Sequence, residues 1–109
     1  RGLSVSLTMD QWAHIITNHK EMPPYFEAVK LTVEDPDEIY FDEWSTQRKM
    51  PGAWVEAYYK RQVLTEDLQA KMLCVSVKFV PTEQGSQGYV QTALPNRRVP
   101  GRLVLQWKK

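Results

Sequence analysis

The segment from Met72 to Val80 alternates between large apolar residues and small or polar ones, and this alternation constrains the fold more than any other feature. The apolar positions are Leu73, Val75, Val77 and Phe79, and the positions between them are Cys74, Ser76 and Lys78. Because successive side chains of a strand point to opposite faces, this segment predicts a strand with one apolar and one polar face. The sheet that contains it needs a covering layer on one side.

The N-terminal quarter of the chain is expected to supply that layer as helices. Thr8 and Gln11 fit a capping box, in which each side chain satisfies a backbone N–H of the first helical turn. The spacing of one helical face is then followed by Trp12, Ile15, Ile16 and His19. Pro23 and Pro24 end this helix, and a short second helix is expected over Tyr25–Val33.

The rest of the chain has the composition of strands separated by short loops. The expected strands are Glu38–Asp42, Trp54–Val63, Met72–Val80, Gly88–Leu94 and Arg102–Trp107. The expected loops and connections are 43–53, 65–70, 82–88 and 95–101. Short connections favour antiparallel pairing. We therefore predict an α+β fold in which N-terminal helices pack on an antiparallel sheet of about four to five strands, with residues 1–109 as a single domain.

Composition excludes several classes of protein. No apolar run approaches the roughly 18 residues of a membrane span, and no signal-peptide pattern is present. The single cysteine, Cys74, cannot form a disulfide within the chain. Only two histidines are present, His14 and His19, and neither an HExxH motif nor a glycine-rich phosphate loop occurs, so no metal site or cofactor is expected. The chain begins with Arg1 rather than Met, and we expect it to be part of a longer polypeptide.

The net charge of +1 conceals a strong asymmetry along the chain. Residues 1–47 carry three Lys or Arg and nine Asp or Glu, a net charge of −6, whereas residues 48–109 carry eleven and four, a net charge of +7. A basic half can form a surface that binds phosphates. It can equally consist of charges spread over solvated faces.

Several side chains have the chemistry to act on a phosphodiester, and each also has a simpler structural interpretation. His19 on the apolar stripe could transfer protons at neutral pH, or it could be a partly buried core histidine. Lys78 and Thr92 on predicted strands could bind a phosphate, or they could be an ordinary exposed lysine and a residue chosen for its β-propensity. His14 lies off the stripe and is expected at the surface.

A second group of residues has the composition of a nucleic-acid contact. The group consists of Tyr58, Tyr59, Lys60 and Arg61, followed in a later loop by Arg97 and Arg98. Tyrosine rings can stack on bases while lysine and arginine bind phosphates. The alternative is that the tyrosines belong to the core and that the cations are solvated.

The order of these motifs resembles the barnase/EndoU/colicin/RelE-like nuclease superfamily, and in particular its phage-associated branch. The resemblance spans roughly residues 10–107, and its motifs are His14-Ile15-Ile16, His19-Lys20-Glu21-Met22, Pro36-Asp37-Glu38-Ile39, Tyr58-Tyr59-Lys60, Val75-Ser76-Val77-Lys78 and Val90-Gln91-Thr92-Ala93. The chain departs from the superfamily at Lys20, where members often have proline.

The resemblance implies helices on a curved antiparallel sheet and a metal-independent endoribonuclease. In that chemistry the ribose 2′-hydroxyl attacks the adjacent phosphate. His19 would be the general acid or base, and Lys60, or Lys78 as a second candidate, the basic strand residue. Arg97 would also stabilise charge in the transition state, Thr92 would orient the phosphate, and Tyr58 or Tyr59 would stack a base. The resemblance further implies RNA as substrate, with tRNA as a candidate, an immunity protein or antitoxin as partner, and a phage-encoded or delivered toxin that acts in the cytoplasm.

Two other functions remain open at this point. A catalytically inactive RNA- or protein-binding domain on the same scaffold would have a basic patch, but His19, Lys60, Lys78 and Thr92 would diverge. A structural appendage of a phage protein would lack a basic cleft and would expose an apolar surface. Convergence of the four side chains on one cleft would favour the nuclease.

Overall fold

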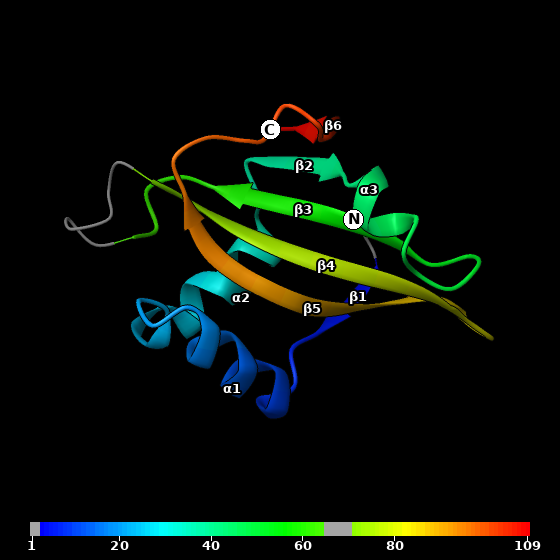
Figure 1. Cartoon of the computed structure of the whole chain (residues 1–109), viewed down its shortest axis with the longest axis horizontal. Coiled ribbons are helices and arrows are strands. Elements are labelled where there is room, and N and C mark those ends of the chain that lie inside the picture. The colour runs from blue at the N-terminus through cyan, green and yellow to red at the C-terminus, as the bar shows by residue number, and fades with distance from the viewer. Residues whose placement is uncertain (1–2, 65–70) are drawn as a thin grey trace.

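The computed structural model describes residues 3–64 and 71–109, and within them six strands form one sheet (Figure 1). The strands are β1 (Ser4–Ser6), β2 (Glu38–Phe41), β3 (Trp54–Lys60), β4 (Met72–Thr82), β5 (Gly85–Asn96) and β6 (Val104–Lys108). The helices are α1 (Met9–Asn18), α2 (Phe26–Glu34) and the single turn α3 (Glu43–Thr46), with a 3-10 turn at Pro23–Tyr25. The α+β class is confirmed.

The predicted sheet is corrected in two respects. It has six strands in the order β1-β5-β4-β3-β2-β6, more than the four to five expected, and it is mixed rather than antiparallel because β1 pairs with β5 in parallel. β1 has only three residues, too few to show an alternating pattern. The other neighbours pair antiparallel, as expected. The predicted connection at 65–70 lies outside the described residues.

The predicted loops at 43–53 and 82–88 are also corrected. The first contains α3, which begins where the Asp42 carboxylate accepts hydrogen bonds from the backbone N–H and the hydroxyl of Ser45. The second is a tight turn at Glu83 and Gln84, with Gly85 at φ 122°, a conformation that glycine adopts without strain. Strands β4 and β5 therefore form a longer hairpin than predicted.

The first helix begins at the predicted cap residue, Thr8, and buries two of the predicted apolar residues. The hydroxyl of Thr8 accepts a hydrogen bond of 3.1 Å from the backbone N–H of Gln11, and Trp12 and Ile15 are buried. The Gln11 side chain also donates to the carbonyl of Gln91 on β5, which fixes the helix to the sheet. His19 differs from the prediction because it follows the last helical residue as the C-cap and is only partly buried.

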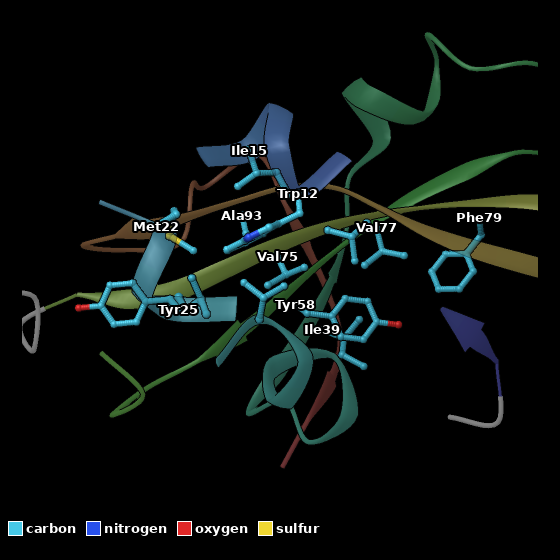
Figure 2. Close-up of a cluster of buried hydrophobic side chains, with 13 residues drawn as sticks. Trp12, Ile15, Met22, Tyr25, Ile39, Tyr58, Val75, Val77, Phe79 and Ala93 are labelled. Atoms are coloured by element: carbon cyan, nitrogen blue, oxygen red, sulfur yellow. The ribbon is translucent and has the colours of Figure 1, made fainter. Parts of the chain in front are cut away.

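The main core lies between the sheet and the pair α1 and α2 (Figure 2). The four apolar residues of β4 on which the prediction rested, Leu73, Val75, Val77 and Phe79, face this core and are fully buried, which confirms the alternation read from the sequence. One extra residue in β5, Gln91, shifts the register beside Ser76, so Val90 and Ala93 both face the core although they are three positions apart.

The opposite side of the sheet, which we call the open face, is covered over only part of its area. A small cluster of Ala57, Tyr59 and Cys74 is covered there by Val99 and Leu103 of the loop between β5 and β6. Farther along β4 and β5, the open face carries polar residues.

Candidate nucleic-acid interface

The polar part of the open face is formed by four residues, Ser76 and Lys78 on β4 and Tyr89 and Thr92 on β5. We call this set the β4–β5 patch. Ser76 pairs directly with Thr92, and Lys78 with Tyr89, so each pair lies side by side on one face. Ser76 and Lys78 lie opposite the core because they alternate along β4 with the buried residues Val75, Val77 and Phe79. Their partners Thr92 and Tyr89 share this face of the sheet. All four are accessible, and Tyr89 is 39% exposed.

Lys78 and Thr92 are thus two predicted site residues that the fold does bring onto one surface. Within the described residues Lys78 makes no ion pair, so its charge is available to a ligand. Ser76 accepts a hydrogen bond of 3.0 Å from the Gln91 side chain, which holds the hydroxyl beside Thr92. An ammonium, two hydroxyls and an exposed phenol can bind an anionic, hydroxyl-rich ligand such as a phosphate and its sugar.

Next to this patch lies an aromatic and cationic cluster that the sequence analysis did not select: Trp44, Arg48 and Arg102. The guanidinium of Arg48 lies 3.5 Å from the centre of the Trp44 ring and that of Arg102 lies 5.6 Å from it, while the indole is 55% exposed. The available signal was a tryptophan within a polar segment, four residues before an arginine. It could not be interpreted because the segment lacks apolar periodicity.

The Trp44 cluster is held in place by the carboxylate of Asp42. Arg102 donates to this carboxylate at 2.5 Å, and Ser45 donates to it from its backbone and its hydroxyl. Burial alone would raise the pKa of Asp42, but the hydrogen bonds from Ser45 and Arg102 outweigh it and hold the pKa below its ordinary value. The loop that carries Arg102 is therefore fastened to the turn that carries Trp44.

Val55 connects the cluster to the β4–β5 patch. Its backbone N–H donates to the hydroxyl of Thr46 at the end of α3, and its cross-strand partner on β4 is Lys78. The turn α3 and Lys78 therefore both lie next to Val55, on the same part of the sheet.

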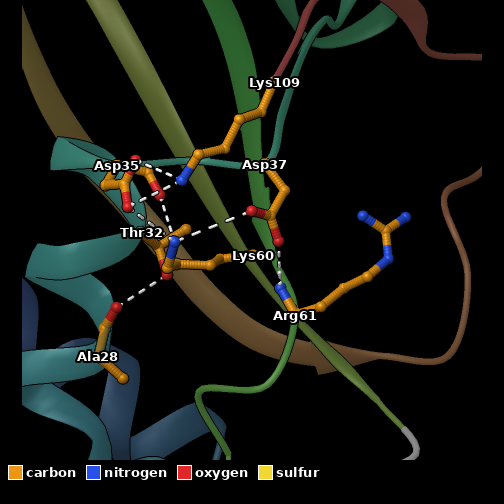
Figure 3. Close-up of polar contacts among 7 residues, drawn as sticks. All are labelled: Ala28, Thr32, Asp35, Asp37, Lys60, Arg61 and Lys109. Atoms are coloured by element: carbon orange, nitrogen blue, oxygen red, sulfur yellow. Dashed lines mark hydrogen bonds and ion pairs between the residues drawn. The ribbon is translucent and has the colours of Figure 1, made fainter.

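Lys60 does not belong to this surface. Its ammonium donates to the carbonyl and the carboxylate of Asp35, at 2.6 and 3.2 Å, and lies 3.8 Å from the carboxylate of Asp37 (Figure 3). It lies on the helix side of the sheet, and its cross-strand partner is five positions along β4 from Lys78, a distance of about 17 Å. Lys60 thus binds acidic groups of its own chain.

The tyrosines of the predicted base-stacking cluster are buried on opposite faces. Tyr58 is 3% exposed in the main core, where its hydroxyl donates to Glu56, and Tyr59 is 1% exposed in the cluster with Cys74. Burial raises the pKa of Tyr59 far above its ordinary value and that of the Cys74 thiol to about 11. Neither ring can stack on a base without leaving its core, which corresponds to the structural interpretation given above.

The remaining predicted residues lie apart from the β4–β5 patch. Arg61 is paired with Glu38 at 3.2 Å. Arg97 and Arg98 are exposed just after the end of β5, where Asn96 pairs with Met72, about 20 Å along the strand from Lys78. His19 lies at the end of α1 on the helix side. His14 is exposed, as predicted.

The charge asymmetry of the sequence is partly neutralised by contacts between the two halves. Among the described residues, four of the eleven basic residues in 48–109 pair with acids of the first half: Lys60, Arg61, Arg102 and Lys109. The other seven make no ion pair there: Arg48, Lys49, Lys71, Lys78, Arg97, Arg98 and Lys108. The basic residues without an ion pair in this part of the chain therefore include Lys78 of the β4–β5 patch and Arg48 of the Trp44 cluster.

The described residues contain no group of three or more His, Cys, Asp or Glu side chains that could hold a metal ion. None of the helices in the same part of the chain is long and apolar enough to cross a membrane. Comparison with protein-family models, curated proteins and solved structures found no match for this chain. The nuclease resemblance therefore stays a prediction from short motifs.

Proposed function

We propose that this domain binds RNA through the β4–β5 patch and the Trp44 cluster, without assembling His19, Lys60, Lys78 and Thr92 into one catalytic site. The observation that carries this proposal is the separation of the four side chains. Lys78 and Thr92 lie on the open face, whereas Lys60 is enclosed by Asp35 and Asp37 and His19 ends a helix on the other side. A basic patch with divergent candidate side chains is the arrangement expected of a binding domain.

RNA is favoured as the ligand by the chemistry of the accessible side chains. Unpaired cations and hydroxyls suit phosphates and ribose 2′-hydroxyls, and exposed aromatic rings suit bases. Lys78, Thr92 and Tyr89 supply these three groups on adjacent strands.

A second candidate function is metal-independent RNA cleavage. The resemblance implies that such cleavage would proceed by transesterification through the ribose 2′-hydroxyl. It is favoured by one observation: Lys78 and Thr92, a phosphate-binding cation and a hydroxyl, share the open face. In this case a residue other than His19 would have to transfer the protons, or the segment that carries His19 would have to move to the open face. An immunity protein or antitoxin would be the partner of this second function.

The exposed apolar side chains of β6, Val104, Leu105 and Trp107, favour a third candidate, a protein-binding appendage. This strand is an edge of the sheet, where unpaired backbone groups can accept another chain. An RNA-binding assay separates the two candidates, because a domain that binds only a protein at β6 would not bind RNA.

The deciding experiment measures binding and cleavage of RNA together. Fluorescence anisotropy with a labelled RNA in EDTA is compared for the wild type, Lys78→Ala and the control Lys20→Ala, which removes an exposed lysine elsewhere. We expect weaker binding and a salt dependence reduced by about one counterion for Lys78→Ala, with no change for the control.

The same reactions are then resolved on a gel with total RNA. Intact RNA supports a binding domain. Discrete fragments that disappear in Lys78→Ala or His19→Ala would establish the ribonuclease instead. Absence of RNA binding by folded wild type would leave the protein-binding appendage.

A further inference from the structure

Trp44 is 55% exposed, more than Trp107 or Tyr89, and hydrogen bonds hold the residues around it. It lies in a one-turn helix whose first turn is capped by Asp42, and the same carboxylate fixes Arg102 beside the ring. Arg48 is fixed as well, because its guanidinium donates to the Trp44 carbonyl at 3.0 Å while it lies over the indole. The cluster therefore presents a partly exposed aromatic ring with two cations beside it to a ligand.

We propose that Trp44, Arg48 and Arg102 form a stacking platform that selects single-stranded over double-stranded RNA. This inference rests on the proposed RNA-binding function and specifies its substrate class. An unpaired base would stack on the part of the indole that Arg48 leaves exposed, and the two guanidiniums would bind the phosphates on either side of that base. The β4–β5 patch would hold the continuing backbone, because Val55 lies between α3 and Lys78.

Selection of a single strand follows from the geometry of the ligand. In a duplex each internal base is stacked on both sides and presents only its edges, so a base face is available to the indole only at the two ends. In a single strand every base has a free face, and stacking on an aromatic side chain does not depend on which base it is. The platform therefore predicts discrimination by strandedness with little dependence on sequence.

The positive charge of the cluster favours RNA over a protein ligand at this position. The cluster contains two arginines, and Lys49 follows directly. The carboxylate of Asp42 is satisfied by Arg102 and Ser45, which leaves Glu43 as the neighbouring acid that makes no ion pair within the described residues. An anionic ligand gains from this surplus of positive charge.

The test uses the whole chain with two labelled probes of equal length, a single-stranded RNA and a blunt RNA duplex, in EDTA. The variants are Trp44→Ala and Trp44→Phe, with Trp107→Ala as matched control because Trp107 is 42% exposed on β6. Circular dichroism and thermal unfolding establish that each variant is folded.

We expect the wild type to prefer the single strand and Trp44→Ala to bind it roughly tenfold more weakly, with little change for the duplex. Trp44→Phe should recover part of the loss, because a smaller ring still stacks, and Trp107→Ala should bind like the wild type. Glu43→Gln should bind the single strand more tightly, because it removes repulsion of the phosphates.

Two results would overturn the platform, and they differ in what they say about the proposed function. If the wild type binds RNA and Lys78→Ala weakens it, but Trp44→Ala does not, RNA binding stands and the platform is wrong. If the folded wild type binds neither probe, both the platform and the RNA-binding function fail, and a protein ligand at the exposed tryptophan becomes the better explanation.

Discussion

Lys60 and Asp35 are 25 positions apart in the sequence, yet the ammonium of one donates to both the carbonyl and the carboxylate of the other. Their contact joins the end of β3 to the end of α2. The ammonium of Lys109, which follows β6, donates to the same carboxylate at 2.9 Å. Hydrogen bonds from Lys109 and Lys60 hold the pKa of Asp35 below its ordinary value. In this structure the Lys60 ammonium therefore binds two acidic residues of its own chain.

Replacing Lys60 with alanine should therefore lower stability rather than RNA binding. Removing this side chain, which is 11% exposed, takes from Asp37 the ammonium beside it and leaves Asp35 with Lys109 as its cation. We expect Tm to fall by roughly 5–10 °C, the scale of one charged hydrogen bond in a domain of this size, while Kd for RNA stays unchanged. The control is Lys109→Ala, which removes a 55% exposed lysine and should change Tm less. Loss of RNA binding by folded Lys60→Ala would return this residue to the candidate site.

Asp42 should stabilise the turn that carries Trp44. Replacement with alanine removes the N-cap and the partner of Arg102, and we expect a loss of about 1–2 kcal/mol in the free energy of unfolding, measured by urea denaturation. Tryptophan fluorescence would report a more solvated Trp44. An unchanged free energy of unfolding would contradict the role assigned to this carboxylate.

The contribution of Asp42 should depend on pH in a defined direction. Its pKa in the folded protein is lowered from 3.8, so the folded state binds a proton less readily than the unfolded state. The stabilisation by Asp42 is then complete at pH values above the ordinary aspartate pKa. It is lost as the pH falls through the lower pKa of the folded state. Urea unfolding between pH 6 and pH 2.5 should show a smaller acid-induced loss for Asp42→Asn than for the wild type. Parallel curves would show that Asp42 makes no such contribution.

A side chain at Gly88 should destabilise the fold, because the Phe79 ring of β4 and the Val5 side chain of β1 both lie close to this glycine. A methyl group at this position would lie 2.7 Å from a ring carbon of Phe79 and 3.0 Å from the Val5 side chain. Since Phe79 is fully buried, we expect Gly88→Ala to lower the free energy of unfolding by about 1–3 kcal/mol. Gly101→Ala is the matched control, because nothing lies within 4 Å of its added methyl group. Equal stability of the two variants would contradict the close packing of Phe79 and Val5 against Gly88.

The Cys74 thiol should be inert in the folded protein. It is buried beneath the loop between β5 and β6, and burial raises its pKa to about 11, so little thiolate exists at pH 8. A disulfide reagent at pH 8 should react with one thiol per chain in denaturant and with almost none in buffer. Rapid reaction in buffer would show that the loop carrying Val99 and Leu103 opens readily.

The sequence by itself determined the elements that have a local signature. The alternation in β4 identified the face that is buried, and the capping box at Thr8 identified the start of α1, because both patterns depend only on neighbouring residues. The short strand β1 and the turn α3 were missed, since three or four residues cannot establish a period.

Only the tertiary structure decided which side chains are available for a ligand. Nothing near Lys60 in the sequence indicates that Asp35 will bind it, and nothing near Trp44 indicates that Arg102 will lie beside its ring. Tyr58 and Tyr59 are adjacent in the chain, but a strand places them in two different cores. Local patterns specify helices and strands, whereas the partner of a charge or an aromatic ring depends on which distant segments the fold brings together.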